Sequence, residues 1–393
     1  MKIFLDAFSK GPTVSIGTQA YIIAAAEVLE RTFPGCEIQI FSADQEVDRW
    51  VFRNEKFNIT MIPRPESAVK AMLALYRTAK HADVVVSLWG DGYISAPARM
   101  ILRKTVFFRL ARARSVLWPS SIGIEKTPVL RKLQRAGLSG FEVLMARDTI
   151  TYDHFQALTL SPLLLVADMA FVLDPSNKER IAELYKQEKI PSDKKCIGLN
   201  ISQLMNQFFI KEGMDYPAFA ADLACFLKEE FDCNVLLIPH QIYPEWYKPK
   251  GVSASSTFGG DDRFAIKEVL KALDGAEGIY PVMGEYDPRE FKGIISSCEL
   301  MVGARMHSII AALSTSVPAV LLGYSHKAKG VLNTLEMGDY VIEFTKEPGE
   351  IKTLVKKAWD NRAVLRASLD RQMPGYQEPA LKVGEQLKTM LEK

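Results

Sequence analysis

Cationic and imidazole side chains follow two neighbouring apolar runs in the last third of the sequence. Arg305 and His307 come just after the first run, and His326 and Lys327 come just after the second. Arginine binds a carboxylate or phosphate through paired hydrogen bonds, lysine supplies a point charge, and histidine transfers protons near neutral pH. The four residues therefore predict a site for a small anionic substrate. The alternatives are an arginine that caps a carbonyl group, histidines bonded to the backbone and a solvent-exposed lysine.

The surrounding residues must position these side chains. They predict a strand at 300–303, a helix at 307–314 and a second strand at 317–322, which form a β-α-β unit of a parallel sheet. Open sheets of this kind bind ligands outside the carboxyl ends of their strands, where both groups of residues fall. The helix also begins there, and its free N–H groups attract anions.

Three further candidates follow other predicted strands. Arg147 closes a strand of the first half, and it either forms an internal ion pair or contacts the same anion. Asp91 stands between two glycines that would let a ligand approach the backbone. His240 is either a structural histidine or a substrate contact, and Asp91 or His240 is the candidate base for substrate protons. No metal-ligand spacing such as H-E-x-x-H occurs, so we expect no metal.

Strand, loop and helix alternate through all 393 residues, which predicts an α/β protein. A charged, polar segment at 175–195 interrupts the alternation, and the domain boundary should lie inside it. We therefore expect two Rossmann-like doubly wound domains, at 1–180 and 190–375, followed by a C-terminal helix at 376–393. The two domains should face a cleft, which is the expected active site.

Composition narrows the class of protein. The sequence is 48% hydrophobic and 24% charged, as in soluble globular proteins, and its net charge of +2 argues against bulk nucleic-acid binding. Five scattered cysteines without a C-x-x-C pair indicate free thiols in a reducing compartment. There is no signal-peptide pattern and no apolar run of roughly 18 to 20 residues. We expect a cytoplasmic protein that is soluble or, at most, peripheral at the inner face of the membrane.

One stretch has two interpretations. Between residues 99 and 114, cations alternate with apolar side chains, which is typical of an amphipathic helix that contacts an anionic membrane surface. A solvated helix face is the alternative. The cations are Arg99, Arg103, Lys104, Arg109, Arg112 and Arg114.

The sequence resembles the polysaccharide pyruvyl transferase family. The resemblance is clearest at Gly303-Ala-Arg-Met-His-Ser-Ile-Ile-Ala-Ala-Leu and at Gly323-Tyr-Ser-His-Lys, which are similar to the family's G-x-R-x-H block and the Y-x-x-K that follows it. Looser matches are Ala146-Arg-Asp and Ala167-Asp-Met-Ala-Phe. The family's N-terminal N-x-G-D loop reads Ser15-Ile-Gly-Thr here.

This resemblance implies a fold similar to that of two-domain GT-B glycosyltransferases, with the acceptor on the N-terminal side and the donor on the C-terminal side. It also implies transfer of a pyruvyl group from phosphoenolpyruvate to two hydroxyls of a saccharide or lipid-linked saccharide, giving a cyclic ketal and phosphate. Phosphoenolpyruvate is a co-substrate, and no cofactor is expected. A homo-oligomer is compatible with the sequence.

The resemblance also implies roles for individual residues. Arg147, His307 and Lys327 match the family's donor-site residues, with Arg305 beside them. We expect His307 to donate the proton and to form the catalytic pair with Lys327. Arg147 and Lys327 would bind the phosphate and the carboxylate, in either order. A GT-B glycosyltransferase that uses a nucleotide sugar and a catalytically inactive sugar-binding relative are the competing hypotheses.

Overall fold

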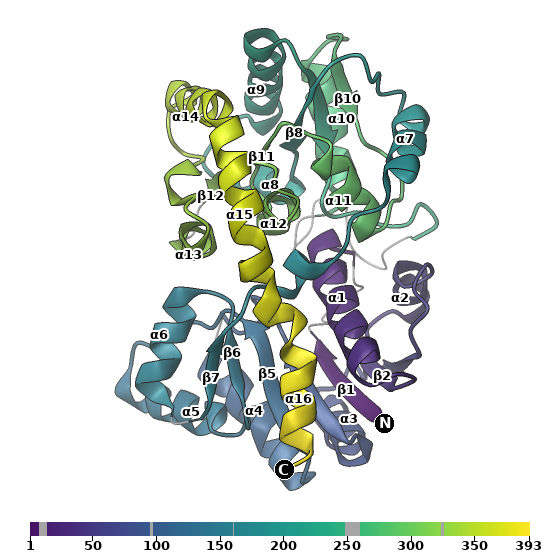
Figure 1. Cartoon of the computed structure of the whole chain (residues 1–393), viewed down its shortest axis with the longest axis vertical. Coiled ribbons are helices and arrows are strands. Elements are labelled where there is room, and N and C mark those ends of the chain that lie inside the picture. Colours follow the sequence, from purple (N-terminus) through teal and green to yellow (C-terminus); the bar gives the residue numbers. More distant parts are fainter. Residues whose placement is uncertain (8–13, 95–96, 160, 248–259, 324–325) are drawn as a thin grey trace. The chain divides into compact units, whose positions relative to one another are not determined.

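The chain divides into two compact units. The computed structural model describes residues 1–7, 14–94, 97–159, 161–247, 260–323 and 326–393. Among these, the first unit contains the N-terminal strand, residues 21–172 and residues 375–393, and the second contains residues 14–20 and 173–374. Figure 1 shows the path of the chain.

The first unit is built on a parallel sheet of seven strands in the order β3-β2-β1-β4-β5-β6-β7, counted over the described residues. Its strands are β1 (Lys2–Ala7), β2 (Glu37–Ser42), β3 (Ile59–Pro63), β4 (Val84–Leu88), β5 (Ser115–Ser120), β6 (Leu144–Ala146) and β7 (Leu163–Leu165). Its helices are most of α1 (Ile16–Thr32), α2 (Gln45–Val51), α3 (Ala68–His81), α4 (Pro97–Leu110), α5 (Pro128–Leu138), α6 (Thr149–Leu158), the 3₁₀ helix η1 (Met169–Val172) and α16 (Val383–Leu391).

The second unit repeats this architecture with six described parallel strands in the order β10-β9-β8-β11-β12-β13. Its strands are β8 (Cys196–Asn200), β9 (Asn234–Ile238), β10 (Ile279–Pro281), β11 (Leu300–Gly303), β12 (Ala319–Gly323) and β13 (Val341–Glu343). Its helices are α7 (Lys178–Gln187), α8 (Gln203–Lys211), α9 (Tyr216–Phe231), α10 (Asp262–Ala272), α11 (Pro288–Ser296), α12 (Met306–Leu313), α13 (His326–Thr334), η2 (Gly338–Tyr340), α14 (Pro348–Asp360) and most of α15 (Arg362–Leu381).

The central strands of both sheets are mostly apolar because helices cover both faces. Every residue of β4, β8, β9, β11 and β12 is buried. The strand order reverses between β1 and β4 in the first sheet and between β8 and β11 in the second. These two switch points are where doubly wound sheets leave a crevice for ligands. The predicted pair of Rossmann-like sheets and the predicted β-α-β unit around His307 are confirmed.

The division between the units differs from the predicted boundary inside 175–195. The first unit ends at Val172 because the next residues bond to α11. Ser176 donates its N–H to the carbonyl of Arg289 at 2.9 Å, and Arg180 forms an ion pair with Glu290 at 2.7 Å. Helix α7 therefore belongs to the second unit.

The C-terminal segment also differs from the predicted single helix at 376–393. Helix α15 runs without interruption from residue 362 to 381, across Pro374 and Pro379, and α16 follows it. Tertiary contacts hold the part beyond Pro374 in the first unit. The Tyr376 ring packs edge-to-face on Phe171 at 4.9 Å between ring centroids, and Gln377 donates to the Phe171 carbonyl at 2.7 Å.

A buried ion pair lies at the switch point of the first sheet. Lys104 of α4 donates to both carboxylate oxygens of Asp6, at 2.5 and 2.6 Å, near the end of β1. Ser87 and the indole N–H of Trp89 donate to the same carboxylate, and the Lys104 ammonium lies 3.3 Å from the centroid of the Trp89 ring. Burial lowers the pKa of Lys104 to about 8, although Asp6 opposes the shift. Lys104 and Asp6 are both buried and paired with each other, which indicates a structural role.

Removing one residue of the Asp6–Lys104 pair should lower the free energy of unfolding more than removing the charges of both residues. We expect Asp6→Ala to lower the free energy of unfolding of the first unit by about 3 to 5 kcal/mol, because it leaves a buried ammonium without its counter-charge. The double variant Asp6→Asn with Lys104→Met keeps an oxygen for Ser87 and Trp89 and removes the charge, so it should lose less. Urea unfolding measures both. If the double variant lost as much free energy of unfolding as Asp6→Ala, or more, the hypothesis that an unpaired buried charge causes the loss would be wrong.

Candidate functional site

Arg305 connects the two strands at the switch point of the second sheet. It is the N-cap residue of α12, directly after β11, and its backbone N–H donates to the Asn200 side-chain oxygen at the end of β8, at 3.0 Å. Its guanidinium donates to Asp262 at 2.9 Å, and its side chain is 18% exposed. Its Nε has no hydrogen-bond partner among the described residues. The guanidinium is therefore anchored on one side and has N–H capacity left for an anion.

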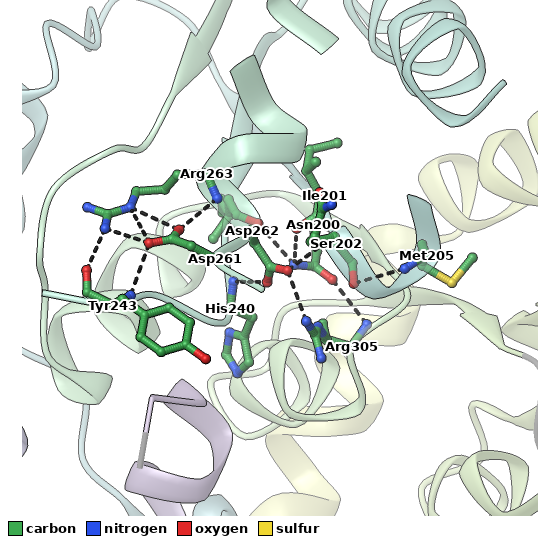
Figure 2. A network of polar contacts seen from close by, with 12 residues as sticks. Asn200, Ile201, Ser202, Met205, His240, Tyr243, Asp261, Asp262, Arg263 and Arg305 are labelled. Atoms are coloured by element: carbon green, nitrogen blue, oxygen red, sulfur yellow. Dashed lines mark hydrogen bonds and ion pairs between the residues drawn. The ribbon is translucent and has the colours of Figure 1, made fainter. Parts of the chain in front are cut away.

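Asp262 is the buried centre of this site. It is the first residue of α10, and its carboxylate accepts the Gln203 N–H at 2.8 Å and the His240 N–H at 2.9 Å in addition to the Arg305 guanidinium. Burial raises the pKa of Asp262, and the charge and hydrogen bond of Arg305 oppose this. Figure 2 shows the Asp262 carboxylate between His240 and Arg305.

His240 follows β9 and presents a buried imidazole. It is 4% exposed, and neither ring nitrogen has a hydrogen-bond partner within the described part of the chain. Burial, with the nearby His307 and Arg305 adding to it, lowers the pKa of His240 well below its ordinary value. The ring is therefore neutral at pH 7, and it offers one acceptor and one donor to a ligand.

His307 is the second residue of α12, and its position depends on a glycine of α1. The segment at residues 14–20 clusters with the second unit, and Ile16 donates its N–H to the His240 carbonyl at 3.1 Å. A Cβ atom on Gly17 would lie 2.3 Å from Cγ and 2.5 Å from Nδ1 of His307. Only glycine lets the backbone of α1 approach this ring so closely.

The other residues predicted from the second half come after the next strand along. His326 and Lys327 begin α13, the helix that follows β12. Since β12 is parallel to β11, both helix starts are at the carboxyl edge of the sheet. The side chains of His326 and Lys327 lie outside the part of the chain that the structure describes.

Arg147 lies in the first unit, after β6, and its guanidinium forms ion pairs and hydrogen bonds with neighbouring side chains. Its side chain is 5% exposed; it donates to Asp168 at 2.5 Å and to the Ser121 hydroxyl at 2.8 Å, and it also pairs with Asp91. Burial alone would lower the pKa of Arg147, but Asp91 and Asp168 raise it above its ordinary value. The internal ion pair considered from the sequence is present, with Asp91 and Asp168 as its partners. The neighbouring Asp148 caps α6 and accepts from Ser121.

Three contributors to the site were missed by sequence reasoning. They are Asp262, Asn200 and Gly17. An Asp-Asp pair directly before an apolar-periodic helix is a helix-start signal, and it could have drawn attention to Asp262. A glycine inside the first turn of a helix was the corresponding signal for Gly17, because that position has no need of a flexible backbone.

The arrangement in the second unit favours an anionic ligand. One guanidinium, two imidazoles and the start of α12 meet at a topological switch point, next to a carboxylate that is already neutralised. Among the residues described, no group of three or more histidines, cysteines, aspartates or glutamates could hold a metal ion. Likewise, no described helix is long and apolar enough to cross a membrane.

Two Rossmann-like units of this kind define the fold class of GT-B enzymes. The structure is similar to the UDP-GlcNAc 2-epimerase of Neisseria meningitidis, with a TM-score of 0.65 and 10% identity over 100% of both chains. It is also similar to a glycosyltransferase of Rickettsia africae (TM-score 0.60, 11% identity, 100% of this chain and 99% of that one) and to MurG of Acinetobacter baumannii (TM-score 0.53, 15% identity, 99% of both). At such identities the likeness establishes the fold alone.

The chain belongs to the polysaccharide pyruvyl transferase family, whose model matches residues 16–326. The amylovoran biosynthesis protein AmsJ of Erwinia amylovora is 37% identical over 75 residues, which are 19% of this chain and 18% of AmsJ. The match thus spans under a fifth of that relative's length.

The contact between Gly17 and His307 predicts that a glycine-to-alanine substitution changes the free energy of unfolding in opposite directions at Gly17 and at Gly375. Gly17→Ala should lower the free energy of unfolding by about 1 to 3 kcal/mol, because the added methyl overlaps the His307 ring. Gly375→Ala, in α15, meets nothing within 4 Å, so it should stabilise by up to about 1 kcal/mol through helix propensity. Chemical denaturation distinguishes them. If Gly17→Ala were stabilising as well, the close approach would be disproved.

The suppressed pKa of His240 leads to a pH-dependent prediction. Below pH 6.5 the unfolded chain protonates His240 and the folded chain does not, so stability falls by up to about 1.4 kcal/mol per pH unit until the folded pKa is reached. His240→Gln removes this contribution. The stability difference between wild type and His240→Gln should therefore shrink by up to about 2 kcal/mol from pH 7 to pH 5. The matched control is His81→Gln, which changes an exposed histidine of α3.

Proposed function

We propose that this protein transfers the pyruvyl group of phosphoenolpyruvate to two hydroxyls of a saccharide or lipid-linked saccharide, forming a cyclic ketal and releasing phosphate. Membership of the pyruvyl transferase family supports a transferase of this kind. The observation that carries the proposal is the group of Arg305, His307 and His240 around the neutralised Asp262.

Phosphoenolpyruvate suits this site because it carries a carboxylate and a phosphate on three carbons. Such a dianion needs several donors close together, and at least one guanidinium able to bond two oxygens. Arg305 has its Nε unpaired among the described residues, and α12 begins beside it. We assign these groups to one anionic end of the donor. Family resemblance adds Lys327 as a further anion contact, and His326 precedes it at the start of α13.

The reaction requires proton movements that two imidazoles can perform. The methylene carbon of phosphoenolpyruvate gains a proton, and the central carbon becomes cation-like and is attacked by a saccharide hydroxyl. The carbon–oxygen bond to phosphate then breaks, and the second hydroxyl closes the ring. Each of the two hydroxyls loses one proton. One of these protons replaces the proton that was given to the methylene carbon, and the other leaves with phosphate. We assign the donated proton to His307 and the first accepted proton to His240, which is neutral at pH 7.

A ligand-protection experiment tests the donor. Phosphoenolpyruvate should raise the melting temperature of the purified protein in a concentration-dependent way, and Arg305→Met should abolish the shift. The fold likeness to a UDP-GlcNAc 2-epimerase and a glycosyltransferase favours a nucleotide sugar as the second candidate donor. Protection by a UDP-sugar and none by phosphoenolpyruvate would overturn the proposal in favour of a glycosyltransferase. Protection by neither donor would leave the inactive sugar-binding relative.

The proton-donor role predicts a loss of turnover without loss of binding. His307→Ala should lower the rate of phosphate release from phosphoenolpyruvate with an acceptor by about 10² to 10⁴, while protection by phosphoenolpyruvate persists. The matched control is His81→Ala, which removes an exposed histidine of α3 and should leave the rate unchanged. Wild-type turnover in His307→Ala would refute the assignment.

A further inference from the structure

Three helices lie side by side on one face of the first sheet. Helix α3 joins β3 to β4, α4 joins β4 to β5, and α5 joins β5 to β6. Because such crossovers are right-handed, the three helices lie on the same face of the sheet. Helices α4 and α5 pack closely: a Cβ atom on Gly137 of α5 would lie 2.8 Å from the backbone nitrogen of Leu102 in α4. Helix α3 packs on the other side of α4. Figure 1 shows the three helices behind the strands of this sheet.

The sequences of these helices contain no acidic residue, although the whole chain has 47 acidic and 49 basic residues. The sequence predicted a basic stretch on α4 alone, and the structure adds the two neighbouring helices. Lys104, counted in that stretch, is buried against Asp6 and does not contribute. The exposed cations of the three helices are Lys70, Arg77, Lys80, Arg99, Arg103, Arg109, Arg131, Lys132 and Arg135. We call this surface the basic layer.

The charges of the basic layer are not neutralised by the protein. Within the described residues, none of the nine cations forms an ion pair. Arg109 and Arg131 donate to carbonyl oxygens, which leaves their charge in place. Glu142, at the edge of the layer, is already paired with Arg114 at 2.7 Å.

Large aliphatic side chains stand among these cations. Val69 is 76% exposed, Val129 67% and Leu110 64%, and Leu73, Val106 and Leu133 are also exposed. None of the large apolar residues exposed on these described helices is aromatic. Exposed aliphatic groups beside uncompensated cations are unusual for a face that contacts only water, and they indicate an interaction surface.

We propose that the basic layer docks on the surface of a bilayer that contains anionic lipids. Cations of this kind are attracted to anionic headgroups, and aliphatic side chains between them enter the boundary between headgroups and acyl chains. A single-stranded nucleic acid would also bind the cations, but it gains most from stacking on aromatic side chains, and none of the described aromatic side chains of these three helices is exposed. Docking goes beyond the proposed transfer reaction, and it would bring the enzyme to a lipid-linked acceptor.

Vesicle sedimentation tests the contribution of the cations of the basic layer to membrane docking. The full chain should co-sediment with vesicles of 3:1 phosphatidylcholine and phosphatidylglycerol at low salt, and not with phosphatidylcholine alone. Each basic residue near such a surface is worth about fivefold in partitioning, so Arg99→Gln/Lys132→Gln/Arg135→Gln should weaken binding roughly 10²-fold. The matched control is Lys178→Gln/Lys186→Gln/Lys267→Gln, which removes three exposed lysines of the second unit. Absence of vesicle binding at low salt, or equal loss in both triple variants, would overturn the proposal.

A second variant tests the apolar component and separates lipid from nucleic acid. Leu110→Ser/Val129→Ser should reduce binding to the anionic vesicles several-fold while unfolding at the same temperature as the wild type, because both side chains are exposed. Binding to single-stranded DNA that is tighter than vesicle binding and unaffected by this double variant would identify a nucleic-acid surface and refute membrane docking.

Discussion

The buried carboxylate of Asp262 is the constraint on which the geometry of the second unit's site depends. A carboxylate with no exposed surface is very costly unless its oxygens are bonded, and here three donors from separate segments satisfy it. These donors are the Arg305 guanidinium and the backbone N–H groups of Gln203 and His240. Because all three must be present together, the loops after β8, β9 and β11 have little freedom to move independently.

The way in which Asp262 bonds also determines the chemistry of His240. In many carboxylate–histidine pairs the carboxylate accepts from the ring, which makes the imidazole more basic. Asp262 instead accepts from the backbone N–H of His240, so the ring receives no such help. Burial and the neighbouring Arg305 then keep the ring uncharged. The same contact thus positions the imidazole and leaves both of its nitrogens for a ligand.

The sequence predicted those features of the structure that depend on the local periodicity of apolar residues. The buried strands, the alternation with helices and the placement of Arg305 and His307 at the end of β11 follow from short stretches of chain. Asp262 was missed because its partners come from distant positions, and no local pattern records such contacts. For the same reason the sequence suggested a break near Pro374, where packing of Tyr376 on Phe171 stabilises a continuous helix.

The two switch points show how one topology can hold either a cation enclosed by its partners or a cation with an N–H group that has no partner among the described residues. In the first sheet, Lys104 is paired with Asp6 and covered by Trp89, so no bonding capacity is left over. In the second, Arg305 is paired with Asp262, but its Nε and the ring of His240 have no partner among the described residues. Since buried polar groups without partners are costly, a protein retains them where a ligand supplies the missing bonds. That difference, and not the number of charges, is the reason to look for the proposed anionic substrate at Arg305.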